Sequence, residues 1–185
     1  MKKILLVTAD KDLVTMINNA LTHYDVDVTV ESNYNEAIET VQRENFDLLI
    51  SDYFLHANGD DEAFNSFSME IDTLDNDMRL LTPMKDNLVR LRQFIHEKSE
   101  EKLFPLGNRL SAEAELFGTD TALLLSLDDP KVDKYDMRDY IEDIATYYCK
   151  YGRHVYYYPY HFPKAAVNKF VKEDVIDAMK IRRIY

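Results

Sequence analysis

The sequence is poor in cysteine and glycine, contains no tryptophan and has no long apolar run. One cysteine in 185 residues excludes an internal disulfide and a cysteine-based zinc site. Four scattered glycines leave no phosphate cradle of the P-loop or dinucleotide-binding kind. No apolar run approaches the roughly 18 residues of a membrane span, and acidic residues interrupt the start that would otherwise resemble a signal peptide. We therefore expect a cytoplasmic protein that has no membrane segment.

Positive charge is also scarce. The chain has 22 lysines and arginines against 34 aspartates and glutamates, a formal net charge of −12. Binding to nucleic acid requires clustered cations, and here basic residues gather only over 180–183, so we expect no nucleic-acid partner. Acidic residues are concentrated over 57–78, where seven occur without a single lysine or arginine. This stretch is typical of an exposed acidic surface.

Short apolar runs alternate with helical stripes along much of the chain. Stripes at helical spacing predict helices after the first, second, fourth and fifth runs, with Asp12 as the N-cap of the first helix. Two successive strand–helix–strand units with short links imply a doubly wound parallel sheet in an α/β fold. The predicted strands are 4–7, 26–30, 48–50, 122–126 and 154–158, the last of which is ended by Pro159.

The alternation of strands and helices fails between the third and fourth predicted strands. Apolar spacing there predicts a helix over 86–100 and a short helix over 111–117. We see no linker to a second domain and expect one domain. Its core is 1–56 and 120–185, with a large insertion, 57–119, between strands 3 and 4.

Asp52 directly follows the third strand, at the edge where parallel α/β sheets place their chemistry. The surrounding residues 47–55, Asp-Leu-Leu-Ile-Ser-Asp-Tyr-Phe-Leu, resemble the receiver domain of bacterial response regulators. The resemblance covers 2–56 well and 121–183 loosely. It implies a flavodoxin-like fold with five parallel strands, a phospho-acceptor at Asp52, and switch positions at Ser126 and Tyr158.

Three positions depart from the receiver pattern. The acidic pair that helps to hold Mg²⁺ falls on Thr8 and Ala9, and the lysine after the fifth strand falls on Tyr158. Phosphoryl transfer depends on a metal and a cation that neutralise the phosphoryl oxygens. We therefore expect a pseudo-receiver: a stand-alone regulatory protein that needs no cofactor, is not an enzyme and acts independently of phosphorylation.

Two alternatives stay open at this point. In the first, the chain is a phosphorylation-competent receiver that switches at Asp52, and Asp10 and Asp52 share a Mg²⁺ ion. In the second, it is a small Mg²⁺-dependent phosphatase or phosphotransferase that uses Asp10 and Asp12, because an Asp-x-Asp motif after an apolar strand also begins the haloacid-dehalogenase-type phosphatases. For Asp52 itself, a purely structural role at the end of a strand is also open.

Tyrosines crowd into residues 147–160, which hold seven of the thirteen. One helix–strand corner can hardly bury all of them, and exposed aromatic patches are typical of protein interfaces. We therefore expect a protein partner, or a second copy of the chain in a homodimer, at this corner. The predicted interface residues are Tyr147, Tyr151, Tyr156, Tyr158, Tyr160 and His161.

Overall fold

Five parallel strands form one sheet, and their order in the sheet differs from their order in the chain. The computed structural model describes residues 1–57, 103–104, 106–126, 155–160 and 164–184. The strands are β1 (Lys2–Val7), β2 (Val26–Glu31), β3 (Leu48–Asp52), β6 (Asp120–Ser126) and β7 (Val155–Tyr160), arranged as β2-β1-β3-β6-β7. This is the strand order of flavodoxin-like folds, so the predicted fold class is confirmed.

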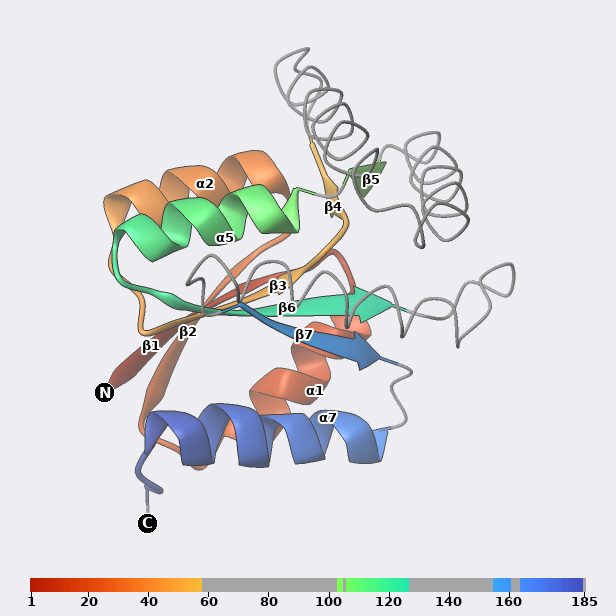
Figure 1. The fold of residues 1–185 in the computed structure, drawn as a ribbon. Coiled ribbons are helices and arrows are strands. Elements are labelled where there is room, and N and C mark those ends of the chain that lie inside the picture. Colours follow the sequence, from red (N-terminus) through yellow and green to blue (C-terminus); the bar gives the residue numbers. More distant parts are fainter. Residues whose placement is uncertain (58–102, 105, 127–154, 161–163, 185) are drawn as a thin grey trace, which may run out of the picture.

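Helices cover both faces of the sheet (Figure 1). On one face lie α1 (Lys11–Leu21) and α7 (Lys164–Phe170), which continues into the wider π-helical turns of η2 (Val171–Asp177). On the other face lie α2 (Tyr34–Arg43) and α5 (Gly107–Leu116). Within the described ranges, none of these helices has both the length and the apolar character needed to cross a membrane.

The two-sided core explains why the strands read as unbroken apolar runs. Successive side chains of a strand point to opposite faces, so Ile4 and Leu6 pack toward α1 and α7, whereas Leu5 and Val7 pack toward α2 and α5. All four side chains have no exposed surface. A strand buried on both faces has no polar side, and for this reason the parallel sheet was recognisable from sequence.

The last strand is longer than predicted. We expected Pro159 to end it, but β7 runs on through Pro159 to Tyr160 and pairs in parallel with β6. Proline cannot donate a hydrogen bond to a neighbouring strand, which restricts it to edge strands and strand ends. In the described sheet β7 is an edge strand, so Pro159 is compatible with its continuation.

Part of the segment that we assigned to the insertion packs onto the core, through Phe104, Leu106, Leu110 and Ala114. A two-residue strand, β4 (Leu55–His56), pairs antiparallel with β5 (Leu103–Phe104), and neither was predicted. The short helix expected over 111–117 begins earlier, at Gly107, as α5. Its residues Leu110 and Ala114 are completely buried in the core on the α2 face. The helix predicted over 86–100, the helix predicted after the fourth strand and most of the acidic stretch lie outside the described residues. The number of domains stays a prediction.

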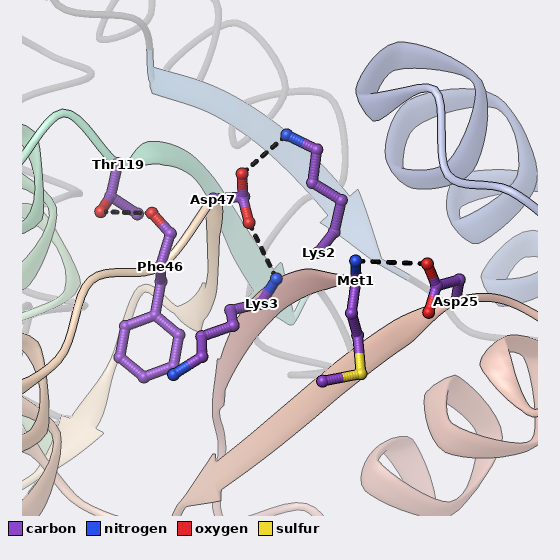
Figure 2. A network of polar contacts seen from close by, with 7 residues as sticks. All are labelled: Met1, Lys2, Lys3, Asp25, Phe46, Asp47 and Thr119. Carbon is purple, nitrogen blue, oxygen red and sulfur yellow. Dashed lines mark hydrogen bonds and ion pairs between the residues drawn. The ribbon is translucent and has the colours of Figure 1, made fainter.

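Polar contacts tie the first strand to the start of the third, at the sheet edge opposite Asp52 (Figure 2). The Lys2 Nζ lies 2.7 Å from Asp47 Oδ1, and the backbone N–H of Lys3 donates to Asp47 Oδ2 at 2.8 Å. The hydrogen bond from Lys2, followed by that from the Lys3 N–H, holds the pKa of Asp47 below its ordinary value of 3.8, although partial burial acts in the opposite direction. Asp47 therefore stabilises the fold in its charged form.

We expect Asp47→Asn to lower the free energy of unfolding at neutral pH by about 0.5–1 kcal/mol, because the amide loses the charge that binds Lys2. The contribution of the depressed pKa is complete above 3.8 and disappears as the pH falls through the folded-state value. Urea unfolding of both proteins at neutral and acid pH measures the difference. Asp27→Asn, an exposed change on β2, is the control. A difference that persists unchanged in acid would contradict the role of the charge.

Candidate functional site at the edge of strands β1 and β3

The strand order reverses between β1 and β3, and doubly wound sheets bind ligands at the carboxyl ends of the strands that flank such a reversal. The two strands pair in parallel with Val7 opposite Ser51. One residue beyond this pair in the sequence of each strand, Thr8 lies opposite Asp52. The sequence-predicted acceptor Asp52 therefore lies where the fold places functional residues.

A hydrogen bond joins Thr8 and Asp52. The Thr8 hydroxyl donates to Asp52 Oδ2 at 2.5 Å, and the same Oγ1 accepts the backbone N–H of Asp10 at 3.1 Å. The Thr8 residue is only 2% exposed. Its hydroxyl thus uses both its donor and its acceptor capacity inside the protein. Thr8 stands where the receiver pattern has an acid. Its hydroxyl donates to the Asp52 carboxylate.

Asp10, not Asp12, is the N-cap of α1, so the predicted cap is wrong. Asp10 Oδ1 accepts the backbone N–H groups of Asp12 at 2.9 Å and Leu13 at 3.0 Å. The helix begins at Lys11, which leaves Asp12 exposed in its first turn. A capping carboxylate satisfies amides that the helix itself cannot pair. Asp10, which we predicted as a candidate metal ligand, therefore has a structural role as a helix cap.

The backbone around Asp52 is held from two sides. Toward the sheet, the Tyr53 N–H donates to the Leu124 carbonyl at 2.7 Å and extends the pairing of β3 with β6. Toward α5, the Gly107 N–H donates to the Tyr53 carbonyl at 3.0 Å. The Ser51 hydroxyl adds a bond to the Asp52 carbonyl at 2.9 Å. Asp52 is thus fixed through its main chain as well as its carboxylate.

Gly107 packs directly on this backbone. A Cβ atom at position 107 would lie 2.6 Å from the Asp52 carbonyl oxygen and 2.9 Å from Tyr53 Cα. Contacts below 3.0 Å are not tolerated, and backbone atoms cannot rotate away as a flexible side chain can. Only glycine fits at this close approach. No local pattern in the sequence connects Gly107 with Asp52, which is 55 positions away in the chain.

The predicted switch positions lie on the neighbouring strands. Tyr158 is in register with Leu124 of β6, which in turn is in register with Asp52, so the three residues form one row across the sheet. Ser126 ends β6 two residues beyond this row and pairs with Tyr160. Tyr156 belongs to β7 as well, whereas the predicted interface residues Tyr147, Tyr151 and His161 lie outside the described residues. The topology thus brings the backbones of Ser126 and Tyr158 to the Asp52 side of the sheet.

The donors at this edge do not match a magnesium site of the receiver kind. Mg²⁺ takes near-octahedral oxygen ligands and is usually held by one or two carboxylates. Here Asp52 accepts the Thr8 hydroxyl, Ala9 offers only a methyl group, and Asp10 caps α1. Across the ranges that the structure describes, no three histidine, cysteine, aspartate or glutamate residues are grouped as metal ligands. The sharing of a metal ion by Asp10 and Asp52 stays a prediction that these contacts do not favour.

Solved structures similar to this chain are mostly receiver domains. A response regulator from Thermotoga maritima is 17% identical, with a TM-score of 0.48 over 95% of this chain and 98% of that one. A receiver domain protein from Methanospirillum hungatei JF-1 is 12% identical, with a TM-score of 0.49 over 97% and 98% of the two chains. A designed Rossmann 2x3 protein is 14% identical, with a TM-score of 0.47 over 96% and 91%. No protein-family model and no curated protein matches the sequence.

The chain has a flavodoxin-like fold. We take this from the strand order β2-β1-β3-β6-β7, with all neighbouring strands parallel. At identities of 12–17% and TM-scores of 0.47–0.49, the similar structures carry no conclusion about the role of the chain. What the edge at Asp52 does follows from its own residues.

We expect Asp10→Ala to lower the free energy of unfolding by about 1 kcal/mol, because two amides of the first turn of α1 lose their acceptor. Asp10→Asn keeps a side-chain oxygen at the same place and should stay within a few tenths of a kcal/mol of the natural protein. Urea unfolding of the three proteins measures this. If asparagine costs as much as alanine, the negative charge of Asp10, and not its capping bonds, is what the fold requires.

Proposed function

We propose that this chain is a receiver-like regulatory protein that takes part in signalling through a protein partner, without phosphorylation of Asp52. The observation that carries the proposal is the hydrogen bond from the Thr8 hydroxyl to the Asp52 carboxylate. A receiver uses the position of Thr8 for a metal-binding acid. In this chain the position holds a neutral donor that engages the acceptor itself.

The chemistry of phosphoryl transfer supports this reading. An aspartate attacks a phosphodonor only when positive charge is placed around the phosphoryl oxygens. Thr8 and Ala9 replace the two acids that would hold the metal, and Tyr158 replaces the lysine. The three changes remove charged side chains at two strands, two of them just after β1 and one within β7. A single compensating residue, such as Asp10, does not restore this set.

The alternative of a phosphatase or phosphotransferase requires Asp10 as a nucleophile. Its carboxylate already accepts two amides of α1 at 2.9 and 3.0 Å. Asp12 is exposed on the first turn of the same helix. Hydrogen bonds to a carboxylate lower its nucleophilicity, and both residues are explained by the start of a helix. We therefore propose a protein without catalytic activity of its own.

The partner is proposed to bind at the tyrosine-rich corner of residues 147–162. Aromatic residues are enriched at protein interfaces because they bury much area and keep a polar group for hydrogen bonding. Four of the six residues of β7 are tyrosines, and β7 lies at the edge of the described sheet. They are Tyr156, Tyr157, Tyr158 and Tyr160. A homodimer through this corner is the second form of the same proposal.

Intact mass after incubation with Mg²⁺ and acetyl phosphate tests the independence from phosphorylation. We expect no added phosphoryl group on the natural protein or on Asp52→Ala. A triple variant, Thr8→Asp with Ala9→Asp and Tyr158→Lys, restores the missing charges and is the matched comparison. It should accept a phosphoryl group at Asp52. An adduct on the natural protein that disappears in Asp52→Ala would overturn the proposal.

A further inference from the structure

The chain leaves the Asp52 edge and returns to it through one small antiparallel ribbon, β4 with β5. On the outgoing side, Leu55 is 2% exposed and pairs with Phe104. On the returning side, the Leu106 N–H donates to the Phe104 carbonyl at 2.7 Å, and the next residue is Gly107. The ribbon therefore has its base at Leu55 and Phe104, on the side of Asp52, and its outer end at His56 and Leu103.

Gly107 joins the base of the ribbon to Asp52 without any flexible side chain between them. The contact is from backbone to backbone, with its N–H on the Tyr53 carbonyl and its Cα close to the Asp52 carbonyl oxygen. Leu106, which precedes it, is 1% exposed and packed in the core. A displacement of the ribbon base must therefore move the Asp52 peptide, because close-packed groups transmit displacement instead of absorbing it.

On its other side, Asp52 is joined to the start of α1. Its carboxylate accepts the Thr8 hydroxyl, and the Thr8 oxygen accepts the N–H of Asp10, which caps the helix. The contacts thus run without a gap from α1 through Thr8 and Asp52 to Gly107. A contiguous set of packed and hydrogen-bonded groups of this kind can carry energetic coupling between two sites of a protein.

We propose that Thr8, Asp52 and Gly107 form a joint that couples the base of the β4–β5 ribbon to the start of α1. A shift at the ribbon alters the Thr8–Asp52 hydrogen bond, and a change at Thr8 alters the seating of the ribbon. Coupling free energies are reciprocal, so the effect must be measurable in both directions. The joint would let the β4–β5 ribbon and the helix α1 influence each other without any phosphoryl group, whether or not the proposed protein partner exists.

Amide hydrogen exchange in the full chain, followed by NMR, tests the joint. Thr8→Val removes the hydroxyl at nearly constant volume. We expect exchange of the Leu106 and Gly107 amides to become about tenfold faster, since loss of one buried hydrogen bond is worth roughly 1.4 kcal/mol or somewhat less. Thr119→Val is the matched control. Thr119 is also buried, at 6% exposed, and its hydroxyl donates to the Phe46 carbonyl at 2.9 Å, at the opposite ends of the strands from Asp52.

The control separates coupling from a general loss of stability. In Thr119→Val the exchange of Leu106 and Gly107 should stay near that of the natural protein. In the reverse direction, Gly107→Ala should accelerate exchange of the Asp10 amide, which is bound by Thr8. If Gly107→Ala does not fold, the comparison of the two threonine variants still decides. Faster exchange confined to residues 8–13 in Thr8→Val, or equal acceleration at Leu106 in both threonine variants, would overturn the proposal.

Discussion

The hydrogen bond between the Thr8 hydroxyl and the Asp52 carboxylate is the contact on which the rest of this edge depends. It exists because β1 and β3 pair with Val7 opposite Ser51, which brings the two following residues together at the point where the strand order reverses. Through Thr8 the contact extends to the cap of α1, and through the backbone of Asp52 it extends to Gly107. Loss of the hydroxyl would leave a partly buried carboxylate with one donor fewer.

Carboxylates at this edge and at the opposite one serve the fold itself. Asp10 caps a helix, Asp52 accepts a hydroxyl, and Asp47 joins β1 to the start of β3 through Lys2. In doubly wound sheets the edge near Asp52 is where ligands and reacting groups bind. Here the Thr8 hydroxyl donates to Asp52, and the N-terminus of α5 lies against the backbone of Tyr53. The flavodoxin-like strand order brings Asp52 to this edge, and positions 8 and 9 beside it carry no acid.

The sheet could be predicted from sequence because strands buried on both faces leave a continuous apolar run, and α1 could be predicted because Leu13 and Ile17 repeat at helical spacing. The start of α5 could not, since its N-cap, Leu106, makes no side-chain capping bond and its first residue is a glycine. The contacts of Asp52 with Thr8 and Gly107 depend on strand register and on a return from far along the chain, which local patterns do not encode. The receiver resemblance places Thr8 near Asp52, but the hydrogen bond between them follows from the register of β1 with β3.

Mg²⁺ titration of the natural protein, followed by amide NMR shifts, tests most directly whether Thr8 has replaced the metal site. The amides of Asp10 and Tyr53 flank the Asp52 carboxylate and report on it. We expect millimolar Mg²⁺ to leave both shifts without a saturable change, because Asp52 is engaged by Thr8, positions 8 and 9 carry no acid, and Asp10 caps α1. A saturable shift of both amides that is abolished by Asp52→Ala would contradict it and would make the edge a working receiver site.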